Sequence, residues 1–492
     1  MIVNNLSIII VILPLFAALL CPIIGFFQRV AAKWYVTLLI TCSFGLSVWQ
    51  LYRVTAFGTL HYNFGRWQMP YGIEFVIDPL NACIIALVAF MGMLSVYFGM
   101  SFVKDQSRLE GNGFYTVLAL LVTGLLGMSS TGDLFNLYVF LEITSLSGYT
   151  LIALGSDKGV ISAFRYLLIG TIGASLYLIG VAFIYAETGS LNMSDVSELL
   201  TGSAGTGTVL VSSVCFIIAF GIKMALFPLH GWQPAAYSNS HPAATALISG
   251  VMGKIPAYAM VRFFYFVFIG QRESLGVLMT VVGIMGAAGM IYGSLIAMKQ
   301  VDIRKMLAYS SVAQMGYIAV GVAIGNYYGL MGSMMHIIGH SLMKGGLFFA
   351  IGGVMYRYGT SMLNEVGQLY RKMPKTVITI VIGALSMVGI PPTAGFFSKW
   401  YLALGACQSG QYWYVAVLVV SSLLNAVYFF KLLEKIFMDH EMAHDDRLWY
   451  SKGELPWTMM LPIILCGIGI VLAGIFNTQL TGIFGLALQG VV

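Results

Sequence analysis

Long apolar runs, separated by short charged or glycine- and proline-rich segments, repeat along the whole chain. A helix needs about 20 apolar residues to cross a bilayer, whereas a spanning strand needs only about 9–11 alternating residues. These runs therefore predict an all-α polytopic membrane protein with about 14 transmembrane helices. The expected spans are residues 3–27, 31–53, 78–102, 114–130, 132–153, 159–186, 207–229, 241–269, 274–298, 304–324, 327–357, 374–407, 411–437 and 457–476.

Two connections between spans are longer than the others. Residues 54–77 place Gly58, Gly65, Pro70 and Gly72 among alternating aromatic residues, which predicts a hairpin on the outer face. The second connection, 438–456, favours a solvated polar link between helices over a metal site, so we expect no metal. Its candidate ligands are His440, Glu441, His444, Asp445 and Asp446.

Composition excludes several classes of protein. The chain has 492 residues, of which 59% are hydrophobic and only 9% are charged, whereas an average soluble domain has about 25% charged residues. The six cysteines form no C-x-x-C pair, and no phosphate-binding G-x-x-x-x-G-K-[ST] motif occurs. We therefore expect no cofactor, no nucleotide hydrolysis and no catalytic centre within this chain, although the complex around it can be an enzyme.

The distribution of basic residues predicts the orientation in the membrane. If the N-terminus lies outside, most of the 25 Lys and Arg residues fall in inside loops or at inside helix ends. Only Arg53, Arg66, Arg262 and Arg272 fall outside, which agrees with the positive-inside rule. An even number of spans then places both termini outside. The net charge of +6 belongs to these loops, so no nucleic-acid partner is expected.

Five ionisable residues fall within predicted spans: Lys223, Lys254, Lys344, Lys399 and Glu142. A charge at the bilayer centre costs on the order of 3 kcal/mol, so such residues face a wet interior or pair with each other. One carboxylate cannot pair with four lysines, which argues against a set of fixed ion pairs. Intramembrane ionisable groups of this kind indicate an ion or proton path.

Prolines interrupt the spans that carry three of these lysines. Pro228 follows Lys223, Pro256 follows Lys254, and the pair Pro391 and Pro392 precedes Lys399. Proline removes a helical hydrogen bond and frees a carbonyl, so each span is expected to break near its lysine. Broken helices at mid-membrane are where transporters place their binding sites. A buried Lys–Glu pair can take up or release a proton when its partner moves.

Histidines mark a further candidate path. His336, His340 and Lys344 recur at i, i+4 and i+8, which places them on one helix face about 12 Å long. Histidine titrates near neutral pH, so this stripe is typical of a proton relay. His230 lies at the end of a span, where it could serve as an inner gate or as an interfacial anchor.

An internal repeat is also expected. The two proline-broken, lysine-bearing spans, near 207–229 and 374–407, lie five spans apart, so the second copy is inverted. The predicted units are two inverted five-helix repeats, each a half-channel, at 114–269 and 274–437. Helices 1–3 with the outer hairpin precede them at 1–113, and a connecting loop with a C-terminal helix follows at 438–492.

Several stretches resemble the antiporter-like subunits shared by complex I, Mrp-type sodium/proton antiporters and membrane-bound hydrogenases. They are residues 135–142, 164–168, 223–232, 302–317, 340–344 and 389–399. The lysine at 399 and the segment 185–193 resemble the D-type member of the Mrp antiporters or its hydrogenase counterpart, and Lys399 also resembles the N-type member of complex I. The resemblance implies a multi-pass subunit of a prokaryotic cytoplasmic (inner) membrane, with other antiporter-like and small helical membrane subunits as partners.

The resemblance also implies roles for residues along a hydrated polar axis. Glu142 and Lys223 would form the coupled pair of the first half-channel. The path would continue through Lys254, His336, His340 and Lys344 and would end at Lys399, in the second half-channel. The function expected is proton translocation, or exchange of protons for sodium. A self-contained proton-coupled solute symporter and a non-conducting scaffold subunit remain as alternatives.

Overall fold

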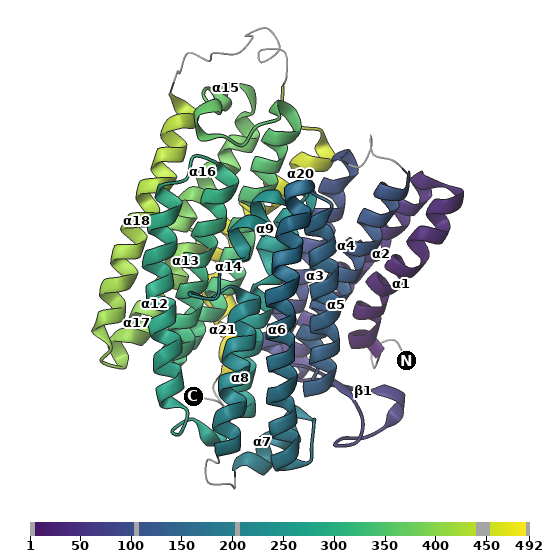
Figure 1. Ribbon diagram of the computed structural model, residues 1–492, viewed down its shortest axis with the longest axis vertical. Helices are drawn as coiled ribbons and strands as arrows, with labels where there is room; N and C mark the ends of the chain where they lie inside the picture. The colour runs from purple at the N-terminus through teal and green to yellow at the C-terminus, as the bar shows by residue number, and fades with distance from the viewer. Residues whose placement is uncertain (1–4, 103–107, 202–206, 439–452, 489–492) are drawn as a thin grey trace.

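A computed structural model describes residues 5–102, 108–201, 207–438 and 453–488 of the chain. These residues form a bundle of long helices that run roughly parallel to one axis (Figure 1). The main helices are α1 (Leu6–Phe27), α2 (Arg29–Phe57), α3 (Pro79–Phe102), α4 (Arg108–Ser130), α5 (Leu134–Ala153), α6 (Asp157–Thr188), α8 (Gly207–Met224), α10 (Pro242–Leu247), α11 (Lys254–Arg262), α12 (Gly276–Met298), α13 (Ile303–Ile324), α14 (Tyr327–Tyr358), α16 (Pro374–Val388), α17 (Ala394–Gln408), α18 (Tyr412–Phe437) and α20 (Trp457–Ile475).

The predicted fold class is confirmed. Within the described residues, 12 helices are long and apolar enough to cross a membrane. Two more of the expected spans are present in another form. One is α5, and the other is divided into the half-helices α16 and α17 by a break at residues 389–393.

Three expected spans differ from the structure in their details. The span expected at 207–229 ends at Met224, because the chain leaves the helix before Pro228. The span expected at 241–269 is interrupted by two π-helical segments, η4 (Ile248–Met252) and η5 (Phe263–Val267). The fourth span begins at Arg108 and not at 114, because the apolar pattern does not mark its polar first turn.

Several short elements were not expected from the sequence. They are the helices α7 (Met193–Thr201), α9 (Gln233–Asn239), α15 (Leu369–Lys372) and α21 (Asn477–Leu488) and the 3-10 turns η2 (Phe64–Arg66), η6 (Ile269–Gln271) and η7 (Leu363–Glu365). Most are too short or too polar to produce an apolar run of spanning length. They lie at the ends of the bundle or beside the helix breaks, so they change the connections and leave the spans in place.

The predicted hairpin is confirmed. Strands β1 (Leu60–Asn63) and β2 (Glu74–Ile77) pair antiparallel, with Leu60 opposite Ile77 and Asn63 opposite Glu74. The hairpin and α7 lie at one end of the bundle, and α15 lies at the other (Figure 1). The predicted outer loop and the basic loop that precedes α16 are therefore on opposite sides.

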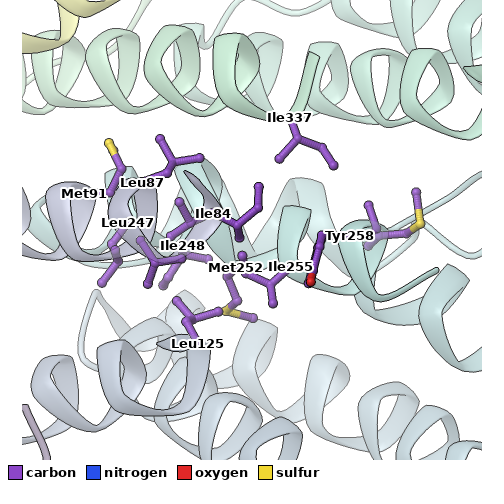
Figure 2. Packing of buried hydrophobic residues seen from close by; sticks show 14 of the residues in the cluster. Ile84, Leu87, Met91, Leu125, Leu247, Ile248, Met252, Ile255, Tyr258 and Ile337 are labelled. Atoms are coloured by element: carbon purple, nitrogen blue, oxygen red, sulfur yellow. The ribbon is translucent and has the colours of Figure 1, made fainter. Parts of the chain in front are cut away.

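The centre of the bundle is the interrupted span formed by α10, η4, α11 and η5. Its most apolar window and that of α14 are each 100% buried within the chain, whereas the windows of α2 and α18 are 33% buried. Figure 2 shows Ile248, Met252 and Ile255 of this span packed among residues of α3, α4 and α14. Tight packing holds the interrupted helix in place from several sides, so the lysine that follows its π-helical turn has a defined position.

Candidate functional site

Lys223 is held by a polar face of α5. It lies in the last turn of α8 with a side chain only 3% exposed. Its ammonium donates a hydrogen bond to the Ser145 hydroxyl at 2.7 Å and another to the Tyr149 hydroxyl at 3.5 Å. These two α5 residues lie one and two turns beyond Glu142, so they form a polar face on this helix.

Glu142 itself lies at the edge of the chain. Its side chain is half-buried, and it forms no ion pair with Lys223 within the described part of the structure. The exposed apolar residues Phe135, Val139 and Leu146 occupy the same face of α5. Glu142 is therefore only partly enclosed by this chain, although its carboxylate lies within electrostatic range of Lys223. A carboxylate on an apolar face needs cover from another molecule.

The break after Lys223 is stabilised by its own hydrogen bonds. Ala225 adopts a φ of 57°, in the left-handed region, and turns the chain out of α8. The freed carbonyl of Ile222 accepts a hydrogen bond from the Trp232 indole at 2.8 Å. Pro228 lies within the break, as predicted, and the chain becomes helical again at Gln233.

His230 lies in the same break. Its side chain is buried, and its ring contacts Phe227 and Tyr292, with centroids 5.4 and 5.1 Å away. The Nδ1 atom of His230 has no hydrogen-bond partner within the described structure. Burial beside the break does not agree with an anchor exposed at the membrane surface, so the role of an inner gate stays a prediction.

Lys254 follows the π-helical turn η4 directly. It begins α11, is 1% exposed, and donates a hydrogen bond to the carbonyl of Ser249 within that turn. Pro256 lies two residues further on, in the first turn of α11, where a missing N–H is tolerated. The interruption expected at Pro256 is therefore confirmed, and it precedes the proline.

Lys344 is fully buried on α14. Its ammonium donates to the Leu307 carbonyl at 2.6 Å and to the Ser310 hydroxyl, both on α13. Lys254 lies within electrostatic range of both Lys344 and His340. Two lysines of different spans therefore approach the same region of the core.

The two histidines lie between Lys344 and Lys399. Their rings stack at 22° with centroids 5.6 Å apart, and both side chains are fully buried. His336 exchanges a hydrogen bond with the Ser398 hydroxyl at 2.9 Å, and its ring stacks on Tyr317. Both ring nitrogens of His340 and both polar atoms of Gln314 have no partner in the described structure. Buried polar atoms without partners are rare. These atoms are therefore suited to hydrogen bonding and proton exchange with water.

Lys399 completes the row from α17. It donates to the carbonyls of Met387 and Val388, each at 2.9 Å, and to the Ser422 hydroxyl at 3.1 Å. These carbonyls end α16, at the break that Gly389 allows with a φ of 97°. The predicted double-proline break, at Pro391 and Pro392, thus supplies two acceptors for the lysine.

Polar residues of α18 around Lys399 were missed by the sequence analysis. Ser422 contacts both Lys399 and the Tyr317 hydroxyl, and Asn425 donates to that hydroxyl at 3.4 Å. Tyr428 in turn donates to Asn425 at 2.6 Å. The signal was present, since Ser421, Asn425 and Tyr428 recur at helical spacing within an apolar span and mark one polar face.

The geometry therefore forms a row of cationic and titratable side chains across the bundle, in which Lys399 is partly buried and the other members are buried. None of the four lysines has a carboxylate within ion-pair distance in the described structure, where hydroxyls and freed backbone carbonyls accept their hydrogen bonds. Among the described residues, no group of three or more His, Cys, Asp and Glu is gathered that could hold a metal ion. The candidate metal ligands at 440–446 lie outside the described residues.

Comparison with known proteins gives one family. The family model described as NADH:quinone oxidoreductase/Mrp antiporter, transmembrane, matches residues 131–425. The chain is 43% identical to NADH-quinone oxidoreductase subunit N of Desulforudis audaxviator, over 97% of each chain. It is 31% identical to the D subunit of the Na(+)/H(+) antiporter of Alkalihalophilus pseudofirmus, over 94% of this chain and 92% of the relative.

A solved structure agrees with these relatives. A chain of the membrane-bound sulfane sulfur reductase, an archaeal respiratory membrane complex, superposes with a TM-score of 0.90. The two chains are 27% identical, and the match covers 99% of this chain and 97% of that one. The fold is therefore shared, over almost the whole length of the chain, with a chain of a membrane complex.

Proposed function

Because the chain belongs to the family of NADH:quinone oxidoreductase and Mrp antiporter transmembrane subunits, we propose that it translocates protons as a membrane subunit of a larger complex. The observation that carries the proposal is the buried row from Lys223 to Lys399, whose ammonium groups are bound by hydroxyls and carbonyls alone. A buried ammonium that is hydrogen-bonded by neutral groups can lose its proton at low cost when its surroundings change.

The path runs through residues from both halves of the chain. It starts at Glu142 and Lys223, passes Lys254, and reaches Lys344 on α14. His340 and His336 connect this region to Lys399, because His336 lies within electrostatic range of Lys399 and His340 within range of Lys254. The stacked rings of His336 and His340, with centroids 5.6 Å apart, form the middle of this path.

The half-buried Glu142 supports a place within a complex. An intramembrane carboxylate on an apolar helix face is costly in lipid. The outer face of α6 next to it is also apolar, with Phe164, Leu168 and Ile172 between 50% and 59% exposed. Another membrane subunit against α5 and α6 would enclose Glu142, and the relatives are subunits of such complexes by name.

The two inverted half-channels remain part of the proposal. Equivalent helices have equivalent neighbours: α4 packs on α5 and α6 on α8, as α12 packs on α13 and α14 on α17. Each unit contains, at the equivalent position, a span broken beside a lysine: Lys223 in the first and Lys399 in the second. The odd offset of five spans requires opposite orientations, which would open one half-channel toward each side of the membrane.

Orientation and the transported ion complete the proposal. The cytoplasmic membrane of a prokaryote, with both termini outside, agrees with the basic residues near α15 and the hairpin at the opposite end of the bundle. Sodium exchange is a second candidate function because one relative is named as a sodium/proton antiporter subunit. Proton flux measured with and without sodium separates the two.

The test measures ion flux in vesicles that hold the whole complex, with assembly checked in parallel. Lys223→Ala should abolish flux, whereas Lys299→Ala, which changes an exposed lysine outside the row, should leave it unchanged. Full flux after Lys223→Ala would favour a scaffold subunit and overturn the proposal. Transport of a solute by the purified chain alone would favour a symporter and overturn it as well.

A further inference from the structure

A cavity of about 300 Å³ lies between α2 and α4, far along the chain from the row of buried lysines. The described residues that line it are Arg29, Val30, Lys33, Met100, Gly111, Asn112 and Tyr115. Two of these are basic and none is acidic. Glu110, beside Gly111, has an exposed side chain and is not part of the lining.

Two helices begin at this cavity. Arg29 is the first residue of α2, whose N-cap residue Gln28 makes no side-chain capping hydrogen bond. Gly111 and Asn112 lie in the first turns of α4. The N-terminal end of a helix carries a partial positive charge and free N–H groups. The start of α2, the nearby first turn of α4 and two basic side chains make the described lining of the cavity electropositive.

Tyr115 supplies a third kind of group. Its side chain is 3% exposed, and its hydroxyl has no hydrogen-bond partner in the described structure. Arg29 lies within electrostatic range of this hydroxyl. A buried hydroxyl without a partner costs free energy, and an anion held by the neighbouring guanidinium would offer it an acceptor.

The wall of the cavity is fixed by close packing of α1 on α4. The Cys21 thiol contacts the Asn112 carbonyl at 3.7 Å. The Asn112 amide lies directly over Gly25, where a Cβ would collide with its nitrogen. These contacts between α1 and α4 define one wall of the cavity.

The surroundings indicate where an occupant comes from. Phe26, Phe27 and Trp34 are 74%, 79% and 53% exposed beside the two basic residues. Exposed aromatic rings next to Lys and Arg are typical of the membrane–water interface. Basic pockets between spanning helices on the cytoplasmic side bind the phosphates of lipid headgroups. The cavity therefore lies at headgroup depth, and α1 and α2, with 39% and 33% of their apolar windows buried, present a face for acyl chains.

We propose that this cavity binds the phosphodiester headgroup of an acidic phospholipid, with Arg29, Lys33 and Tyr115 as its contacts. Arg29 and Lys33 bind the phosphate oxygens, and the Tyr115 hydroxyl donates to one of them. The exposed aromatic residues hold the glycerol end of the lipid at the interface. Binding of this kind would anchor α1 and α2, the least buried pair at the start of the chain.

The experiment titrates the purified full-length chain with phosphatidylglycerol, phosphatidylcholine of the same acyl chains, or inorganic phosphate, and counts bound molecules by native mass spectrometry. Each basic residue near the membrane surface contributes about fivefold to affinity for acidic lipid. Arg29→Gln with Lys33→Gln should therefore weaken phosphatidylglycerol binding about 25-fold and leave phosphatidylcholine binding unchanged. The matched control, Lys299→Gln with Lys305→Gln, removes the same charge from exposed positions and should keep the wild-type affinity.

Tyr115→Phe removes only a hydroxyl and should weaken phosphatidylglycerol binding about fivefold, with a melting temperature of the lipid-free protein no lower than that of the wild type. If the double variant does not fold, Tyr115→Phe tests the proposal by itself, and wild-type affinity for phosphatidylglycerol in this variant would overturn it. Equal losses in the double variant and its control would overturn the proposal in favour of unspecific charge attraction. Inorganic phosphate that binds as tightly as phosphatidylglycerol would overturn the lipid as the source of the anion. None of these outcomes depends on ion transport.

Discussion

The Lys399 ammonium donates a hydrogen bond to the carbonyl of Val388, the last residue of α16, at 2.9 Å. The lysine thus binds the end of the half-helix that precedes it in the same span. Carbonyls at a helix C-terminus carry a partial negative charge, and they stabilise a cation without a carboxylate. The helix break and the charge stabilise each other, because the lysine donates hydrogen bonds to carbonyls at the end of α16 and these carbonyls compensate its charge.

Lys399→Ala should abolish ion flux, because it removes a titratable group. The complex should still assemble, because water can bind the two carbonyls, of Met387 and Val388, that lose their donor. Lys399→Glu should keep part of the flux if the position needs only a group that gains and loses a proton. Flux in vesicles with the whole complex is the measurement, and Lys299→Ala serves as control. Wild-type flux in the alanine variant would reject a role for Lys399.

Glu142→Gln and Lys223→Ala should each stop transport, and the double variant should be no worse than either single one. Residues that act as one unit are non-additive in this way. The same vesicle assay measures the effect, with the amount of assembled complex as control. Partial losses that multiply in the double variant would show that the two residues lie on the path independently.

Gly170→Ala should lower ion flux and destabilise the protein by about 1–3 kcal/mol, the usual cost of overpacking. An added Cβ would collide with the Tyr149 hydroxyl and lie 3.5 Å from the Lys223 ammonium. Gly45→Ala is the matched control, since a Cβ there meets nothing within 4 Å. Melting temperature and flux are measured on both variants, and equal behaviour of the two would contradict the close packing of α6 on this lysine.

Asp78→Asn should destabilise the protein by about 3–5 kcal/mol, because it leaves the Arg262 charge without its partner in a largely buried position. Arg262 donates to Asp78 and, through Nε, to the Tyr258 hydroxyl at 2.8 Å. The double variant Asp78→Asn, Arg262→Gln should recover part of the loss. Thermal unfolding in one detergent compares the three proteins, and a double variant that is less stable than Asp78→Asn would be inconsistent with an unpaired charge as the cause.

Much of the fold follows from local pattern. Apolar runs of spanning length marked the spans because a helix must satisfy every backbone hydrogen bond within lipid. Pro391 and Pro392 marked a break because a proline within a helix removes a backbone hydrogen bond, and two adjacent prolines interrupt the helix strongly. The hairpin of β1 and β2 was indicated by turn residues among alternating aromatics, which is again a local signal.

Other features were hidden because they depend on contacts between distant segments. No sequence pattern distinguishes the π-helical turn before Lys254, since Ile248–Met252 has the composition of an ordinary apolar α-helix. The sequence placed Glu142 and Lys223 as partners, whereas in the chain Ser145 receives the lysine's hydrogen bond at 2.7 Å. Which residue on a helix face meets a partner depends on how two helices are rotated and shifted against each other.

The sequence by itself determined that the chain spans a membrane, that prolines break the helices near Lys223 and Lys399, and which few residues carry charge at membrane depth. Each of these follows from the free-energy cost of exposing polar groups to lipid. This cost depends on a single residue or a single helix, so it can be read from the sequence. Only the tertiary structure decided that the lysines are held by carbonyls and hydroxyls, that Ser422 and Asn425 support Lys399, and that Glu142 lies at an edge. Those outcomes depend on the packing of one span against another, because a side chain's partner is set by which helix face it meets.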